Sequence, residues 1–215
     1  IGALYVPPRP EAVAGHLADL MDFCNRRDLH PIVQASIAHA QFESIHPFTD
    51  GNGRIGRALV NTILRRRRIT TGVVVPIASA IVARRDDYFD ALAAHRAGDG
   101  GPLILAFAVG ARIAAAESRI SAVRLAEMPD RWVEQAGSPR LGSGARKLIA
   151  KFPASPVFSA DELELNFAGA TSSLYAAIDQ LQASGVIRPL TNRSRNQVWV
   201  VSAVADELDS LAVRI

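Results

Sequence analysis

The sequence has a single cysteine, only two lysines and no long apolar run, and each scarcity excludes a class of protein. Cys24 has no partner in the chain, which excludes an internal disulfide and a zinc site built from cysteines. No stretch approaches the roughly 18 uncharged apolar residues of a membrane-spanning helix, and no apolar signal core follows a basic N-terminus. We therefore expect a cytoplasmic protein with no membrane partner, in which Cys24 fills the core.

The scarcity of lysine also excludes a Walker-type phosphate loop, because neither Lys147 nor Lys151 is followed by Ser or Thr. The net charge is only +3, which is too small a surplus to indicate a nucleic-acid partner. Hydrophobic residues make up 49% of the 215 residues, which excludes a disordered chain and is enough for one large domain or two small ones.

Prolines and apolar spacing predict a helical first half. Pro10 followed by Glu11 is typical of a helix start, and Pro31 is expected to start a second helix. The second helix should end at His46, because the residue before a proline avoids the helical region. We expect helices at residues 10–24, 31–46, 54–68, 79–97 and 102–126. The arginine run at 65–68 is interpreted as solvated cations at a helix C-terminus rather than as a nucleic-acid patch.

Composition changes between Met128 and Gly144, where proline, glycine and serine accumulate, and this predicts a linker. We place a domain boundary there, which gives domains at residues 1–135 and 136–215. In the second domain we expect short helices at 145–152, 160–167 and 171–184, and strands at 186–187 and 198–201. Three helices and a two-stranded hairpin form a winged helix-turn-helix pattern, with residues 168–170 as its turn.

The loop between the second and third predicted helices contains the residues that can bind an anion. Gly51, Asn52 and Gly53 all tolerate positive φ, so their backbone N–H groups can curl around a phosphate at the start of a helix. Arg54 and Arg57 are three residues apart and therefore share one face of that helix, where their guanidinium groups could hold successive phosphates. The segment is predicted to be a nucleotide-phosphate site.

Two further residues of the loop suggest chemistry at the phosphates. Asp50 is a lone acid among these donors, so we infer that Mg²⁺ lies between its carboxylate and the phosphate oxygens. His46 stands at the edge of the loop, and an imidazole with an ordinary pKa of ~6.5 accepts a proton at neutral pH, which suits a general base acting on a hydroxyl. Individually these features are typical of helix ends, turns and solvated arginines. Their combination in twelve residues favours a site.

Residues 46–57 match the signature His-Pro-Phe-x-(Asp/Glu)-Gly-Asn-(Gly/Lys)-Arg-x-x-Arg, and the chain therefore resembles the Fic family of protein adenylyltransferases. The flanking segments 5–8, 42–45 and 85–92 also resemble the family, and the resemblance covers roughly residues 1–130. It implies a mainly α fold, in which an all-helical Fic core precedes the small α+β winged domain.

The resemblance also implies a role for each residue of the loop. His46 is expected to deprotonate a Ser, Thr or Tyr hydroxyl of a target protein, which then attacks the α-phosphate of ATP and expels pyrophosphate. Asp50 is expected to hold Mg²⁺, and Phe48 to anchor the loop in the core. The expected nucleotide-binding residues are Gly51, Asn52, Gly53, Arg54 and Arg57.

Two elements of the family have no counterpart in these residues. The hairpin flap that aligns the target normally precedes the segment 5–8, and the inhibitory motif Ser/Thr-x-x-x-Glu-Gly/Asn appears nowhere. Because the chain begins at Ile1 and not at Met, we expect that both lie in a longer precursor.

The second domain leaves two functions open. Its third helix offers Thr171, Ser172, Ser173 and Tyr175, and its hairpin offers Arg193 and Arg195, all of which could contact DNA. From Arg140 onward, however, eight basic and seven acidic residues nearly cancel, which favours protein docking or homodimerisation. The main hypothesis is an adenylyltransferase that uses ATP and whose winged domain recruits partners. The alternative is a DNA-binding regulator that uses the Fic fold as a nucleotide sensor, but such a sensor would not need His46.

Overall fold

The computed structural model describes residues 5–167, 169–191 and 196–215. The fold is mainly α, as predicted, with one small sheet near the C-terminus. Contacts divide the chain into two compact units, one made of the residues up to 118 together with 215, and one of residues 119–214. In the described part of the chain, no helix is both long and apolar enough to cross a membrane.

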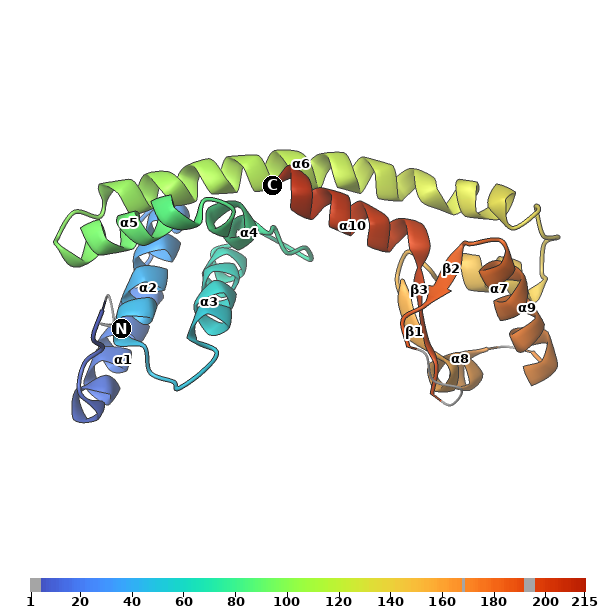
Figure 1. Cartoon of the computed structure of the whole chain (residues 1–215), viewed down its shortest axis with the longest axis horizontal. Coiled ribbons are helices and arrows are strands. Elements are labelled where there is room, and N and C mark those ends of the chain that lie inside the picture. Colours follow the sequence, from blue (N-terminus) through green and yellow to red (C-terminus); the bar gives the residue numbers. More distant parts are fainter. Residues whose placement is uncertain (1–4, 168, 192–195) are drawn as a thin grey trace. The chain divides into compact units, whose positions relative to one another are not determined.

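The first unit is built from five helices and the start of a sixth, as far as the structure describes it (Figure 1). They are α1 (Pro10–Asn25), α2 (Pro31–Ile45), α3 (Asn52–Arg66), α4 (Ile77–Val82), α5 (Arg85–Arg96) and α6 (Gly101–Gln135). The first two begin at proline as predicted, each after a residue of extended conformation, because proline supplies helical φ and needs no hydrogen-bond acceptor at that position.

Helix α2 lies at the centre of this unit and packs against both α1 and α3. Its alanines at 35, 38 and 40 are fully buried and allow the close approach of its neighbours, while Phe42 and Ile45 fill the space near its C-terminus. Cys24 is buried in the same core, as expected. Because α2 and α3 run side by side, the loop that joins them is held at both ends (Figure 1).

The predicted helix at residues 79–97 is two helices. Arg84 has φ −110° and ψ 65°, which ends α4, and α5 starts directly afterwards. Asp86 and Asp87 lie in the first turn of α5, where negative charge is favoured by the helix dipole. Apolar periodicity continues across the break, and so the sequence pattern did not indicate it.

The predicted linker at residues 128–144 is also wrong over its first half. Helix α6 continues to Gln135 with Pro129 inside it. Trp132 and Ala136 are buried in the core of the second unit, and this packing outweighs the hydrogen bond that proline cannot make. The contact-based division falls inside α6, after Ser118, whereas we had placed the boundary at 135/136.

The second unit continues from α6 with α7 (Gly144–Ile149), β1 (Val157–Ser159), α8 (Ala160–Asn166), α9 (Thr171–Ala183), β2 (Ile187–Pro189), β3 (Val198–Val201) and α10 (Ser202–Arg214). The strands form an antiparallel sheet in the order β1-β3-β2, with Phe158 opposite Trp199 and Ile187 opposite Val201. The sequence predicted α7, α8, α9, β2 and β3, but neither β1 nor α10.

A separate core lies in this unit. It contains Trp132 and Trp199, with the stacked rings of Phe152 and Phe158 between them. Leu148, Leu174 and Leu181 complete it from α7 and α9. Ala168, Arg193 and Arg195, on which the turn and hairpin predictions depended, lie outside the described residues.

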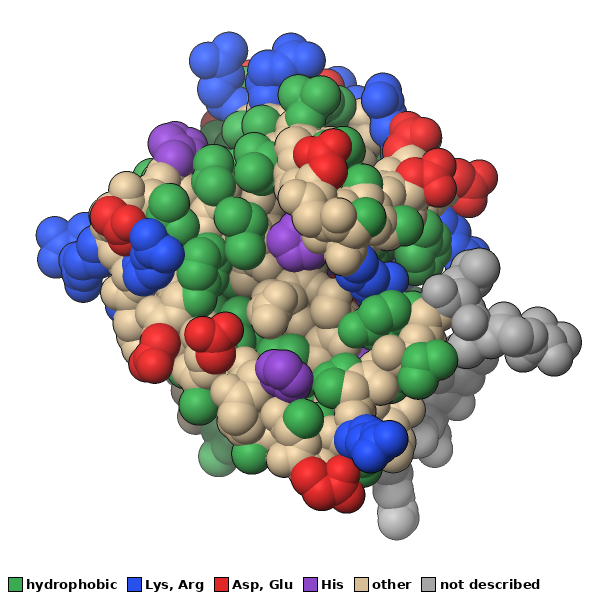
Figure 2. Space-filling model, turned by 90° about the vertical axis from the view of Figure 1, so that its left-hand side faces the viewer, with side chains coloured by type: hydrophobic (Ala, Val, Ile, Leu, Met, Phe, Trp, Pro, Cys, Tyr) green, Lys and Arg blue, Asp and Glu red, His purple; other side chains and the backbone are tan. Residues whose placement is uncertain are grey.

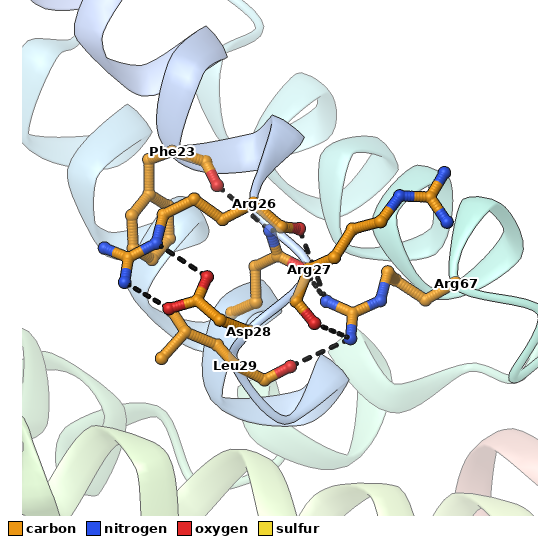
Figure 3. Close-up of polar contacts among 7 residues, drawn as sticks. Phe23, Arg26, Arg27, Asp28, Leu29 and Arg67 are labelled. Carbon is orange, nitrogen blue, oxygen red and sulfur yellow. Dashed lines mark hydrogen bonds and ion pairs between the residues drawn. The ribbon is translucent and has the colours of Figure 1, made fainter.

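Arginines at the end of α3 hold the end of α1 in place. Arg67 donates hydrogen bonds to the carbonyl oxygens of Arg27 (3.2 Å) and Leu29 (2.9 Å) and to the Gln34 side chain (2.6 Å) (Figure 3). Arg66 binds the carbonyl oxygens of Cys24 and Asn25 in the same way. The prediction that the whole arginine run is solvated is therefore wrong for these two. Arg66 satisfies carbonyl groups at the end of α1, and Arg67 satisfies carbonyl groups of the loop between α1 and α2.

Candidate active site

The site is formed where α2 ends and α3 begins. His46 is the C-cap of α2 in the left-handed conformation (φ 49°, ψ 56°), and its N–H still donates to the carbonyl oxygen of Phe42. Pro47 cannot continue the helix, so the chain turns away there. As a result, the His46 side chain stays exposed at the edge of the loop.

Asn52 gives the loop its shape. Its side chain is buried, accepts a hydrogen bond from the N–H of Phe48 (3.0 Å) and donates one to the carbonyl oxygen of Phe48 (2.6 Å). The predicted contact of Asn52 with a nucleotide would therefore have to come from its backbone. Phe48 itself is 48% exposed, with its ring 6.4 Å from that of Phe42, so the expectation that it anchors the loop in the core is wrong.

The start of α3 presents an anion-binding backbone. Gly51 is the N-cap with φ 87°, a conformation that favours glycine. No described residue accepts a hydrogen bond from the N–H groups of Asn52, Gly53 or Arg54, because these lie in the first turn of a helix. The prediction that Gly51, Asn52 and Gly53 all curl the backbone through positive φ is wrong for Asn52 and Gly53, which are the first two residues of α3. The N–H groups at this helix start can still bind an anion.

The two arginines of the motif differ in their surroundings. Arg54 is exposed and forms an ion pair with Asp50 (3.0 Å), whose carboxylate also accepts the N–H of Gly51 (2.7 Å). Arg57 is half-buried and makes no side-chain hydrogen bond or ion pair within the described part of the chain. Its Nη1 atom lies 3.3 Å from the position that a Cβ on Gly53 would take, so glycine leaves room for this guanidinium at the helix start.

A cavity of about 410 Å³ brings part of the motif together, and this volume lies within the range of small-ligand sites. Of the predicted site residues, His46, Gly53 and Arg57 line it, whereas Asp50, Gly51, Asn52 and Arg54 do not. The opposite wall is mostly apolar and comes from α4, α5 and α6, where it includes Ile81, Phe89, Leu92 and Phe107. The cavity therefore joins a cationic end to an apolar wall.

Three polar residues of this cavity were not predicted as site residues. His39 is buried, and its Nε2 is 2.8 Å from the hydroxyl of Tyr88. Burial lowers the pKa of His39 and raises the pKa of Tyr88, so both are held neutral. Glu43 lies one turn beyond His39 on α2, and its Oε1 is buried with no hydrogen-bond partner in the described residues. The spacing of 39, 43 and 46 along one helix face was the available sequence signal.

The segment before α1 closes one side of the cavity. Tyr5 and Pro7 line it, and the Tyr5 hydroxyl donates to the carbonyl oxygen of Ser44 (2.8 Å). The guanidinium of Arg96 stacks on the Tyr5 ring at 3.7 Å and also binds the Ser44 hydroxyl (3.2 Å). These contacts attach the segment to α2 at Ser44, two residues before His46.

The comparisons with known proteins agree with the motif. Residues 2–64, which contain α2, the loop and most of α3, match the model of the Fic/DOC family. The chain is 36% identical over 103 residues to protein adenylyltransferase fic-1 of Caenorhabditis briggsae, a match that covers 46% of this chain and 19% of that protein. It is 37% identical over 103 residues to protein adenylyltransferase Fic of Nematostella vectensis, with 46% and 23% covered.

The chain spans about a fifth of the length of the curated relatives it matches. A solved Fic family protein from Desulfovibrio desulfuricans G20 has a TM-score of 0.50 with this structure at 24% identity, covering 91% of this chain and 56% of that one. This likeness concerns the fold alone.

Proposed function

We propose that the protein is an adenylyltransferase that transfers AMP from ATP to a Ser, Thr or Tyr hydroxyl of a target protein. The observation that supports this best is the exposed imidazole of His46 at a cavity that is also lined by Gly53, at the start of α3, and by Arg57, whose guanidinium has no ion-pair partner in the described part of the chain. A base and an anion site on the same cavity are what the attack of a hydroxyl on a phosphate requires.

In this proposal His46 accepts the proton of the target hydroxyl while the oxygen of that hydroxyl forms a bond to the α-phosphorus of ATP. The bond between the α-phosphorus and its bridging oxygen to the β-phosphorus breaks, and pyrophosphate leaves with that electron pair. The free N–H groups at the start of α3 and the guanidinium of Arg57 hold the phosphate oxygens while charge develops on them. Arg54 joins them once it exchanges Asp50 for phosphate.

The surroundings of Asp50 fit a magnesium ion. Its side chain is 90% exposed, and the N–H of Gly51 fixes one oxygen at the start of α3. Mg²⁺ is commonly bound by one or two carboxylates and by substrate phosphates. The described residues contain no group of three or more His, Cys, Asp or Glu that would bind a metal without a substrate. We therefore assign Asp50 as the protein ligand of a Mg²⁺ ion that neutralises phosphate charge when bound.

The proposal extends to the second unit. Its elements follow the order of a winged helix-turn-helix domain, with α9 in the position of the third helix, and we propose this assignment for residues 136–215. We further propose that this domain docks a protein partner or a second copy of the chain. A cytoplasmic location is part of the same proposal.

A DNA-binding regulator is the second candidate function, because α9 exposes polar side chains at its start. Against it, Tyr175 on this helix is bonded to Glu164 (2.8 Å), and the eight basic and seven acidic residues from Arg140 onward nearly cancel. Figure 2 draws a face of the first unit, on which acidic as well as basic side chains are exposed. Filter binding to random duplex DNA separates the two functions. A steep decrease of affinity with salt favours the regulator, whereas weak binding with a shallow slope favours the docking domain.

His46→Ala tests the main proposal. We expect the transfer of labelled AMP to lysate proteins to fall by ~10²- to 10⁴-fold, because a general base is lost. ATP affinity, measured by calorimetry, should stay within a few-fold, since the imidazole acts on the hydroxyl and not on the phosphates. His16→Ala is the matched control, because His16 is exposed on α1 and does not line the cavity. Equal transfer by the parent and His46→Ala would remove His46 from the reaction.

A further inference from the structure

The candidate cavity contains a negative charge that the proposed reaction does not use. Glu43 lines it together with Arg57 and Gly53, which form the proposed anion site. The Oε1 atom of Glu43 is buried and has no hydrogen-bond partner in the described residues, and no ion pair joins Glu43 to Arg57. An acid and a guanidinium therefore share one cavity while each stays without a direct partner.

The packing of α3 against α2 confines Glu43. A Cβ on Gly56 would lie 2.5 Å from Glu43 Oε1 and 3.0 Å from His39 Nδ1, so the bare backbone of Gly56 closes one side of the carboxylate. His39 lies one turn below Glu43 and is itself fixed by the hydroxyl of Tyr88. With these neighbours, the carboxylate cannot move toward α3 and stays at the cavity wall.

The charges around Glu43 are mainly positive. Burial raises the pKa of Glu43, while His46, Arg57 and Arg96 act in the opposite direction by favouring the ionised carboxylate. Arg96 already binds Tyr5 and Ser44, and the exposed imidazole of His46 is the proposed base. Arg57 is thus the cation in this set whose binding capacity is open to a ligand.

We propose that Glu43 is a counter-charge that sets the affinity of the anion site at Arg57. A phosphate that approaches Arg57 meets the carboxylate of Glu43 across the same cavity, and their repulsion weakens binding. This inference rests on the proposed transferase function. Its consequence there is that pyrophosphate is bound weakly and dissociates after AMP transfer. A site without this charge would bind the product more tightly and turn over more slowly.

Inorganic pyrophosphate is the probe, measured by calorimetry at pH 8 and constant ionic strength without divalent cations. We expect Glu43→Gln and Glu43→Ala each to lower the Kd for pyrophosphate by about tenfold, as expected for one unit charge removed from a partly buried site. Asp90→Asn is the matched control, because it removes the same charge from an exposed position on α5 outside the cavity, and it should change the Kd by less than about twofold.

A second comparison tests whether the effect involves Arg57. In an Arg57→Ala background, pyrophosphate binding should be weak, and Glu43→Gln should then alter it by much less than tenfold. Thermal unfolding monitored by circular dichroism identifies any variant that does not fold. The two replacements at position 43 differ in size, so the result does not depend on one of them packing well.

The outcomes separate this inference from the proposed function. Unchanged or weaker pyrophosphate binding in both position-43 variants overturns the counter-charge, even if the parent transfers AMP. Tighter binding in both, combined with no AMP transfer by the parent, upholds the counter-charge and overturns the transferase. Absence of pyrophosphate binding in the parent and in both variants overturns the anion site and with it the counter-charge.

Discussion

Gly56 determines how closely the two helices of the site approach each other. It is buried in α3 against Glu43 and His39, and any side chain there would push on two polar groups of the cavity. The family signature leaves this position unspecified, so no sequence pattern singles Gly56 out. Its importance follows from packing, which a motif does not encode.

Gly56→Ala is expected to destabilise the protein by about 1–3 kcal/mol, because a close-packed contact becomes a clash. Gly15→Ala is the control, since a Cβ on Gly15 of α1 meets no atom within 4 Å. That change should stabilise the protein by roughly 0.5–1 kcal/mol through helix propensity. Urea unfolding of both variants measures the difference. If Gly56→Ala is as stable as Gly15→Ala, the contact at Gly56 is not tight.

Among the secondary-structure elements, those with a local start signal were predicted well. Helices α1 and α2 begin at their prolines, whereas α3 spans Asn52–Arg66 and so begins and ends two residues before the expected bounds of 54 and 68. The site followed from the same segment, because the chain order of the motif already places His46, Gly53 and Arg57 around one loop.

Elements that depend on distant contacts were not predicted. Helix α6 continues past Pro129 because Trp132 is buried in the core of the second unit. Strand β1 forms by pairing with β3, which lies some 40 residues later in the chain. The partners of the motif arginines could not be predicted from the sequence either. Helical spacing places Arg54 and Arg57 on one face, but only the tertiary structure shows that Arg54 pairs with Asp50 and that Arg57 lines a cavity without an ion-pair partner among the described residues.

The attachment of α3 to α2 and to the loop between α1 and α2 is predicted to depend on Arg67. Arg67→Ala removes the donor to the fully buried Gln34 side chain and to two carbonyl groups of the loop. It should lower the free energy of unfolding by about 1–3 kcal/mol, because the buried side-chain oxygen of Gln34 is left unsatisfied. Arg65→Ala removes an exposed arginine of the same run and should change stability by less than about 0.5 kcal/mol. Similar unfolding free energies for the two variants would contradict the role of Arg67.

Glu207 is expected to make the attachment of α10 to α6 sensitive to acid. Hydrogen bonds from Ser121, Arg214 and Arg124 lower the pKa of Glu207 to about 2, against the effect of its burial. A depressed carboxyl pKa contributes stability above the ordinary value of 4.5, and that contribution is lost as pH falls toward 2. The free energy of unfolding of the parent should therefore exceed that of Glu207→Gln by about 3 kcal/mol at pH 7, and this difference should decrease below pH 4.5.

Chemical unfolding between pH 7 and pH 3 measures this difference. Asp206→Asn is the control, because Asp206 is the next residue along α10 and pairs with Arg188 at the surface, where ion pairs contribute about 0–1 kcal/mol. A constant difference between the parent and Glu207→Gln over this range would exclude the proposed acid sensitivity.

At the scale of the whole molecule, the chain has two hydrophobic cores, one for each unit. Leu64 lies in the first core and Leu148 in the second, and both are fully buried. A chain with two independent cores need not unfold in a single cooperative transition. The same substitution in either core can therefore show whether the units unfold separately.

Leu64→Ala and Leu148→Ala should each lower the free energy of unfolding of the unit that carries the change by about 2–5 kcal/mol, because removing a buried leucine side chain leaves a cavity. Scanning calorimetry of the full chain should show one transition shifted to lower temperature in Leu64→Ala and the other in Leu148→Ala. ATP, if it binds the first unit, should raise only the transition that Leu64→Ala lowers, since a ligand stabilises the unit that binds it. One transition that moves equally in both variants and with ATP would mean that the helix α6 shared by the two units makes them unfold together.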